Sequence, residues 1–254
     1  MMQAMPRQDP GTDLELQVAV AKVSKYAVIE SGDTVEFIER PNGGLSLVMV
    51  DGQRSGRSAK AISNIVARKA ISLLADGVRD GAAARAAHDY LRALRGGQVS
   101  ATLNIVSVDL STGTIVVSRN SHCPVVIVDA GNEVRLLDEP SEPIGIHART
   151  KPVIAELPIV LDTWLVVYTD GLQSAGQQYG EPFDVPAFVG GYLCPCESNP
   201  ATAGGLADAL LARAVSLDRG RPGDDVSVVV AAVAARRHEP GPQDVRRVSV
   251  SFPI

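Results

Sequence analysis

Aspartate residues stand at the ends of three strongly apolar segments of this sequence. The segments and their acids are LSLVMV followed by Asp51-Gly52, WLVVYT followed by Asp170-Gly171, and Asp224-Asp225 followed by VSVVVAAV. A strand end is a rigid position whose last side chain reaches the rim of a sheet, so carboxylates there can converge on one point. Carboxylates held that close repel one another and raise one another's pKa unless a cation neutralises them.

A hard divalent cation is the chemistry that this pattern favours. Mg²⁺ and Mn²⁺ prefer oxygen ligands and combine carboxylates, backbone carbonyls and water. The glycine of an Asp-Gly pair has no Cβ, so its carbonyl can approach an ion. Taken singly, an Asp-Gly pair is a common hairpin turn, and Asp76-Gly77 and Asp80-Gly81 are interpreted as helix-end and turn punctuation. The metal prediction depends on the same arrangement occurring three times.

The elements that must position these acids follow the order expected of antiparallel sheets. Alternating apolar residues predict strands, and apolar residues three and four positions apart predict helices. The predicted strands span residues 14–20, 34–39, 45–50, 101–110, 114–119, 125–129, 164–169 and 226–233, and the predicted helices span residues 56–76, 82–95 and 205–216. Because most strands follow one another without an intervening helix, we expect the sheets to be antiparallel.

The composition is that of a globular protein without a polyanionic partner. Of 254 residues, 45% are hydrophobic and 21% are charged, which permits a sizeable core. Lys and Arg number 24 against 29 Asp and Glu, so the overall charge offers no attraction to nucleic acid or to an anionic membrane. No stretch approaches the roughly 20 apolar residues that a membrane-spanning helix requires.

The cysteines and histidines do not form a recognisable metal site. Cys123, Cys194 and Cys196 are odd in number and lack zinc-site spacing, and reduced thiols fit a cytoplasmic protein. The histidines make no pair at helical spacing. His122 is interpreted as a structural residue in a turn, and His88 as a surface residue of a helix.

Three regions follow from the distribution of polar and apolar residues. Residues 1–13 are polar and are interpreted as a flexible lead-in, and residues 14–235 carry the periodic pattern of one domain. Residues 236–254 form a C-terminal extension whose end alternates Val248, Val250 and Phe252. This pattern leaves open an added edge strand, a dimer contact or a disordered tail.

Seven short motifs, taken in their order along the chain, carry a family resemblance. They are Ser31-Gly32-Asp33, residues 50–59 (VDGQRSGRSA), Ala101-Thr102-Leu103, Ser121-His122-Cys123-Pro124, Pro143-Ile144-Gly145-Ile146, Tyr168-Thr169-Asp170-Gly171-Leu172 and Asp224-Asp225-Val226-Ser227. Over about residues 14–235 the chain resembles the PPM metal-dependent protein phosphatases, and most of all their SpoIIE branch. The resemblance implies an α+β fold, a four-layer α/β/β/α sandwich of two antiparallel sheets flanked by helices.

The resemblance also implies a set of site residues. Asp51 would bridge two Mn²⁺ or Mg²⁺ ions, and the Gly52 carbonyl would bind one of them. Asp170 and Asp224 would bind the other ion, with Asp225 as the alternative to Asp224. Asp33 would act in catalysis through a metal-bound water or a more weakly held ion.

Two positions depart from the pattern beside the expected metal site. Gln53 follows the Asp-Gly pair where many eukaryotic-type members have a proton-donating histidine, a histidine that the SpoIIE branch also lacks. Arg54 stands where the branch usually has glycine. Because guanidinium groups match phosphate geometry, we hypothesise that Arg54 or Arg57 binds the substrate; the alternative is that both face solvent at a helix start.

The implied function is hydrolysis of phosphoserine or phosphothreonine on a signalling protein by a metal-activated water. The chain is similar to small stand-alone phosphatases that reset bacterial stress-response and anti-sigma-factor switches, so a phosphorylated regulatory protein of the anti-anti-sigma type is the expected partner. The alternative is a phosphatase-like binding module without turnover. A glycosidase is the weakest interpretation, because one Trp, five Tyr and four Phe provide few sugar-stacking rings.

Overall fold

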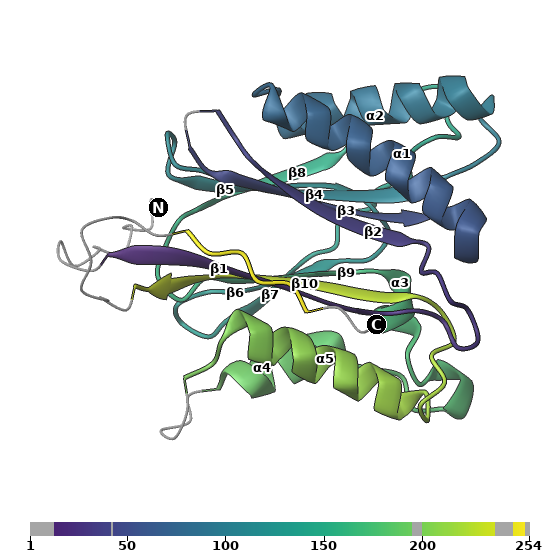
Figure 1. Ribbon diagram of the computed structural model, residues 1–254. Coiled ribbons are helices and arrows are strands. Elements are labelled where there is room, and N and C mark those ends of the chain that lie inside the picture. Colours follow the sequence, from purple (N-terminus) through teal and green to yellow (C-terminus); the bar gives the residue numbers. More distant parts are fainter. Residues whose placement is uncertain (1–12, 42, 195–199, 237–245, 252–254) are drawn as a thin grey trace.

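The chain folds into four layers, in which helices cover the outer faces of two stacked β-sheets (Figure 1). The computed structural model describes residues 13–41, 43–194, 200–236 and 246–251. Each sheet has five strands, and every strand pairing is antiparallel. The implied α+β sandwich is therefore confirmed.

The first sheet joins the two ends of the domain. In spatial order its strands are β1 (Leu14–Val23), β10 (Val226–Ala235), β9 (Trp164–Tyr168), β6 (Val125–Val128) and β7 (Val134–Leu137). β1 and β10 pair along their whole length, from Leu14 opposite Ala235 to Val23 opposite Val226. The segment before β10 is thereby placed beside the end of β1.

The second sheet follows the chain more closely. In spatial order its strands are β2 (Asp33–Glu39), β3 (Leu45–Gly52), β4 (Ala101–Asp109), β5 (Thr114–Asn120) and β8 (Val153–Pro158). The register places Asp33, the first residue of β2, directly opposite Asp51 near the end of β3. Two acids far apart in the sequence are neighbours for this reason.

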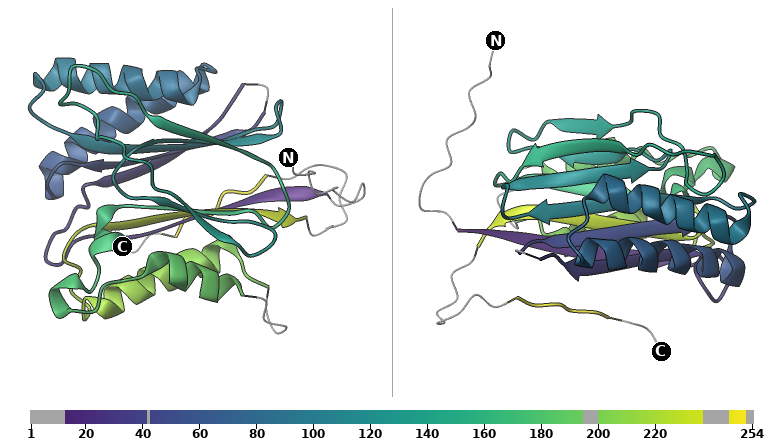
Figure 2. Two further views of the ribbon diagram at one scale, coloured as in Figure 1. Left: turned by 180° about the vertical axis from the view of Figure 1, so that it is seen from behind. Right: turned by 90° about the horizontal axis from the view of Figure 1, so that it is seen from above.

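Each sheet has its own pair of helices. α1 (Gly56–Ala75) and α2 (Asp80–Arg95) lie side by side over the second sheet, as the view from above shows (Figure 2). α4 (Val185–Leu193) and α5 (Ala203–Leu217) cover the first sheet, and the short α3 (Asp170–Ser174) and a 3₁₀ turn (Gln177–Tyr179) follow β9. None of the helices in the described part of the chain is both long and apolar enough to span a membrane.

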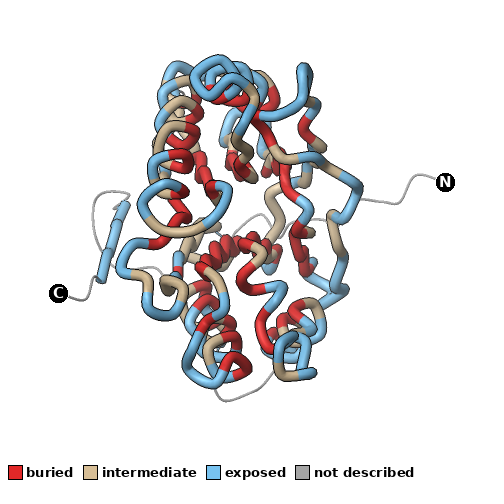
Figure 3. The backbone as a smooth tube through the Cα atoms, turned by 90° about the vertical axis from the view of Figure 1, so that its right-hand side faces the viewer, coloured by how far each residue is buried: buried red, intermediate tan, exposed pale blue. Residues whose placement is uncertain are grey.

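The strand period of two divides the core into three apolar layers. On β3, Val48 and Val50 pack under α1 and α2, whereas Leu47 and Met49 face the other sheet. The buried residues run along the strands and the inner helix faces, and the outer helix faces are exposed (Figure 3). The middle layer is built almost wholly from aliphatic side chains, as the scarcity of aromatics requires.

The observed elements correct several sequence-based expectations. β7, β8, α3 and α4 were not predicted, and β1 extends to Val23. His88 is 1% exposed and accepts a hydrogen bond from the Gly145 amide, so its interpretation as a surface residue is wrong. Residues 246–251 form no strand or helix; the rest of the C-terminal extension beyond residue 236 lies outside the described residues.

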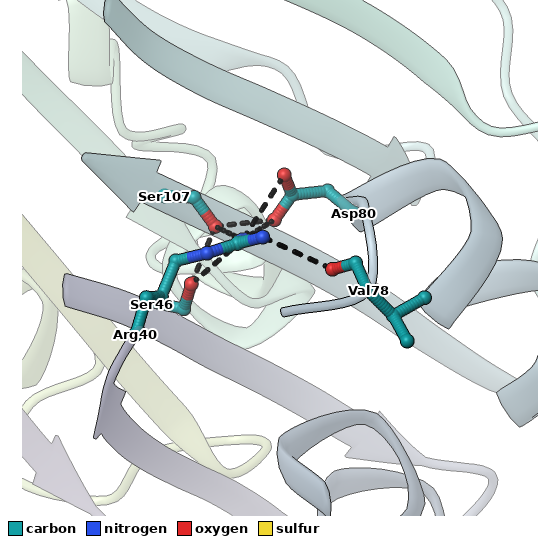
Figure 4. A network of polar contacts seen from close by, with 5 residues as sticks. All are labelled: Arg40, Ser46, Val78, Asp80 and Ser107. Carbon is teal, nitrogen blue, oxygen red and sulfur yellow. Dashed lines mark hydrogen bonds and ion pairs between the residues drawn. The ribbon is translucent and has the colours of Figure 1, made fainter. Parts of the chain in front are cut away.

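Asp80 also differs from its interpretation as turn punctuation. Its carboxylate is buried and lies 3.3 Å from Nη1 of Arg40, which contacts Ser46 and Ser107 as well (Figure 4). Nη2 of Arg40 donates to the Val78 carbonyl at 3.0 Å. This network ties the turn between α1 and α2 to the strands beneath it. It lies near the start of β3, whereas Asp51 lies near the other end of that strand.

Candidate metal centre

Five aspartates from both sheets meet at one end of the sandwich. Asp33 and Asp51 face each other across β2 and β3. In the other sheet, Asp170 follows β9 by two residues, and Asp224-Asp225 immediately precede β10. The Thr169 amide donates to the Ser227 carbonyl at 3.1 Å, which holds the two strand ends together. The structure thus brings Asp33, Asp51, Asp170 and Asp224 to one place.

Asp51 is at the electrostatic centre of this group. Burial, followed by the charges of Asp33, Asp170 and Asp224, raises the pKa of its carboxyl to about 9. Burial also raises the pKa of Asp170, followed by the charge of Asp224. An acid surrounded by three others cannot ionise cheaply at neutral pH unless positive charge is added.

Asp33 has one carboxylate oxygen with a partner and one without. Its Oδ2 accepts a hydrogen bond from the Thr169 hydroxyl at 3.0 Å, whereas its buried Oδ1 has no hydrogen-bond partner in the described structure. Burial raises the pKa of Asp33 to about 6. A buried, unpartnered carboxylate oxygen is costly, and a cation would satisfy it.

These oxygen donors are of the kind that a hard divalent cation prefers, although the side chains are not arranged around an ion position. Within the described ranges, no group of three or more His, Cys, Asp or Glu side chains is arranged to hold a metal ion as it stands. The acids are nevertheless near enough for the charges of Asp33, Asp170 and Asp224 to raise the pKa of Asp51. The oxygen-only donor set suits Mg²⁺ or Mn²⁺, so the side chains would have to close inward on binding.

Asp224 and Asp225 differ clearly in their contacts. Asp225 is 4% exposed, and its two carboxylate oxygens accept the amides of Lys25 and Gly32 at 2.9 and 2.8 Å. Asp225 therefore holds the loop that leads into Asp33. Among the described residues, Asp224 accepts only the neighbouring amide of Asp225, and its charge acts on Asp51 and Asp170. This contrast favours Asp224 as the ligand.

The glycines after Asp51 and Asp170 are required by close packing. A Cβ on Gly52 would lie 2.2 Å from the carbonyl oxygen of Ala59 in α1, and one on Gly171 would lie 2.1 Å from the carbonyl oxygen of Asp225. Neither Asp-Gly pair forms a hairpin turn: one ends β3 and the other opens α3. The first helix therefore packs directly on the backbone that would supply a metal ligand.

We expect Gly52→Ala to weaken both folding and metal binding. The added methyl group would push α1 and the end of β3 apart, and overpacking of this kind costs about 1–3 kcal/mol. Chemical unfolding would measure the loss of stability, and calorimetric titration with Mn²⁺ would measure the loss of affinity. Gly113→Ala provides a comparison, since nothing lies within 4 Å of its added Cβ and only its positive φ of 67° opposes the change. Equal Mn²⁺ affinity in the Gly52→Ala protein would argue against a ligand role for the Gly52 carbonyl.

The two candidate substrate-binding arginines lie at the surface beside the cluster. Arg54 is exposed and has a positive φ of 76°, a conformation that favours glycine. The Arg57 side chain is 96% exposed, and its Nε lies 3.9 Å from Glu30. Their role in binding substrate stays a prediction.

Sequence reasoning missed several residues that the fold places at this site. The hydroxyl of Thr169 bonds Asp33, and its position directly before Asp170 was an available signal. His122 lies 3.8 Å from Asp170, beside the cluster. Lys22 and Lys60 both contact the main chain of Asp33. No spacing rule pointed to these lysines, because long-range pairing alone brings them there.

Comparison with known proteins points to one family. The model of the family described as Stage II sporulation protein E matches residues 41–234. Comparison with curated proteins gives no match. Among solved structures, the phosphatase domain with a regulatory-domain fragment of SpoIIE from Bacillus subtilis has a TM-score of 0.75 at 18% identity, covering 89% of this chain and 66% of that one.

Two further structures share the fold. The RsbU and RsbW domains of a Mycobacterium tuberculosis protein give a TM-score of 0.68 at 20% identity, over 88% of this chain and 61% of that one. The catalytic domain of the serine/threonine phosphatase PstP, solved with two manganese ions, gives 0.66 at 16% identity, over 87% of this chain and 100% of that one. This chain thus spans about two thirds or less of the two longer relatives, and the whole of a catalytic domain.

Proposed function

Because this chain belongs to the SpoIIE family of PPM-type phosphatases, we propose that it hydrolyses phosphoserine or phosphothreonine on a regulatory protein with two Mn²⁺ or Mg²⁺ ions. The observation that carries the proposal is the convergence of three acids, Asp33, Asp170 and Asp224, on Asp51, where their charges add to burial in raising the pKa of its carboxyl to about 9. Bound cations would offset the repulsion among these carboxylates, and no other use for such a cluster is evident. An oxygen-only cluster at strand ends suits phosphoryl transfer.

The residues of the chain have distinct roles in this proposal. Asp51, at the centre of the acids, would bridge the two ions, with the Gly52 carbonyl on one and Asp170 and Asp224 on the other. Asp33 would hold a water or a weaker ion through its unpartnered Oδ1. When bound, the ions would lower the pKa of a water and neutralise charge on the phosphoryl group.

The substrate proposal rests on the family and on its relatives. One similar structure contains RsbU and RsbW domains in one protein, and another belongs to work on the bacterial stressosome. We infer a phosphorylated signalling protein of the anti-anti-sigma or stress-complex type as the substrate. A cytoplasmic location is part of the same proposal, and the free thiols of Cys123 and Cys194 support it.

The second candidate is a phosphatase-like module that binds partners without turnover. Arg54 favours it, since a bulky residue at a φ of 76° stands beside the site where the branch usually has glycine. Gln53, whose side chain accepts the Ser100 amide at 3.2 Å, cannot serve as a proton donor. The retained acids favour the enzyme.

A phosphate-release assay separates the two candidates. We expect the protein to hydrolyse p-nitrophenyl phosphate and a phosphoserine peptide when Mn²⁺ is present, and to lose this activity when a chelator is added. Excess Mn²⁺ should restore it. Hydrolysis that continues in chelator would contradict a metal-dependent enzyme, and binding of the peptide without any phosphate release would support the binding module.

A further inference from the structure

Two lysines from different layers converge on one oxygen beside the metal centre. Nζ of Lys22, at the end of β1, lies 2.9 Å from the carbonyl oxygen of Asp33, and Nζ of Lys60, in α1, lies 2.7 Å from the same oxygen. Lys60 also donates to the Thr34 hydroxyl at 3.0 Å. Since both ammonium groups contact one atom, they are at most 5.6 Å apart.

Neither ammonium group forms an ion pair with a carboxylate of the described structure. No described Asp or Glu oxygen lies within 4.0 Å of either Nζ, and their hydrogen-bond acceptors are an uncharged carbonyl and a hydroxyl. The carboxylate of Asp33 instead accepts a hydrogen bond from the Thr169 hydroxyl at 3.0 Å. The lysines are therefore close to the acids without neutralising them directly.

Holding two ammonium groups this close together raises the free energy of the folded protein while no anion is bound. Burial lowers the pKa of Lys22, and the charge of Lys60 lowers it further, against the raising effect of Asp33 and Asp225. Burial likewise lowers the pKa of Lys60, against the raising effect of Asp33, Glu30, Glu36 and Asp225. Two like charges this close, on neutral acceptors, would be stabilised by an anion that contacts both. Lys22 as a whole residue is exposed and Lys60 is half-buried, so a ligand can reach both although their ammonium groups are partly desolvated.

We propose that Lys22 and Lys60 form an anion-binding subsite that takes an acidic side chain beside the phosphorylated residue of the substrate. The proposal rests on the proposed function. A protein of net charge −5 repels an acidic substrate segment, and a pair of cationic side chains at the edge of the site offsets that repulsion. Specificity for acidic flanking sequence follows from this geometry.

Paired substrates provide the test. The full chain with Mn²⁺ would be assayed on p-nitrophenyl phosphate, on a phosphoserine peptide with neutral flanking residues, and on the same peptide with flanking glutamates. Because a hydrogen bond to a charged group contributes about 1.5–3 kcal/mol, Lys22→Met and Lys60→Met should each raise KM for the acidic peptide about tenfold or more. Each variant should raise KM for the other two substrates by a smaller factor, so that the preference for the acidic peptide is lost.

Lys69→Met is the matched control, since Lys69 lies on the same helix and its ammonium group stacks over the Tyr90 ring. It should leave all three substrates unchanged. Lys60→Arg, which keeps the charge, should keep most of the preference for the acidic peptide. Thermal melts of each variant identify loss of folding, and Lys22→Met remains a test if Lys60→Met does not fold.

Other outcomes overturn the proposal. An equal rise in KM for all three substrates, or a loss of Mn²⁺ affinity measured by calorimetry, would show that the lysines only hold the Asp33 main chain. A direct binding measurement separates this failure from failure of the proposed function. If wild type releases no phosphate at all, an unphosphorylated glutamate-rich peptide should still bind wild type more tightly than Lys22→Met, and equal binding would refute the subsite.

Discussion

Asp51→Asn is expected to abolish Mn²⁺-dependent phosphate release. The charges of Asp33, Asp170 and Asp224 act on the carboxylate of Asp51, so Asp51 is the group placed to bridge two ions. An asparagine amide carries no charge and is a weaker ligand. Loss of the bridge should remove turnover on p-nitrophenyl phosphate and phosphopeptide alike. Glu39→Gln, which changes an exposed acid at the far end of β2, is the control and should keep full activity.

The same substitution should not destabilise the metal-free protein. A group whose folded-state pKa is raised contributes stability that is present below its unfolded pKa and is lost as pH rises through the folded pKa. For Asp51 the loss extends from about pH 4 to about pH 9. The asparagine variant cannot ionise there, so its stability relative to wild type should increase across this range. Urea unfolding at pH 6 and pH 9 without metal would measure the change.

Added metal should separate the two proteins further. A ligand that binds only the folded state stabilises it by about 2.7 kcal/mol at a hundredfold excess over its dissociation constant. Wild type should therefore melt at a higher temperature as Mn²⁺ is added, whereas Asp51→Asn should respond much less. Equal shifts in the two proteins would show that Asp51 is not the bridging ligand.

The sequence was most informative where a local pattern decides the structure. The strongly apolar runs at 45–50 and 226–233 predicted β3 and β10 to within two residues. β7 and β8 were missed because their exposed and half-buried residues, such as Val134 and Ile154, sit at sheet edges, where the apolar signal is weak. α4 contains a Gly-Gly pair, which argues against a helix locally, and its packing on the first sheet overrides this; Pro186 lies in the first turn, where proline is tolerated.

The residues of the site can likewise be divided into those that a local pattern predicts and those that depend on long-range contacts. The convergence of Asp51, Asp170 and Asp224 could be predicted because each ends or precedes an apolar strand. The distinction between Asp224 and Asp225 was not, because it depends on amides about 200 positions away, those of Lys25 and Gly32. The same holds for the contact of Lys22 and Lys60 with Asp33. Long-range register decides such contacts, and no single-sequence pattern encodes it.

The second large effect is expected far from the metal centre, at the pair formed by Arg40 and Asp80. Their side chains are 11% and 8% exposed, and Ser46 and Ser107, which pair across β3 and β4, complete the hydrogen bonding. Removing one partner of a buried ion pair leaves an uncompensated charge, which costs about 3–5 kcal/mol. Asp80→Ala and Arg40→Ala should each lose this much stability in urea unfolding.

A contrast within the chain makes this prediction specific. Arg246 and Glu39 form a shorter ion pair, at 2.7 Å, but their side chains are 67% and 63% exposed, so Glu39→Ala should cost at most about 1 kcal/mol. The double variant Arg40→Met/Asp80→Leu removes both buried charges and should recover much of the loss seen in either single variant. Phosphate release by the folded protein should change little, because the pair contacts the start of β3 and Asp51 lies near the other end of that strand. If the single variants lost no more stability than Glu39→Ala, burial would not govern the strength of these ion pairs.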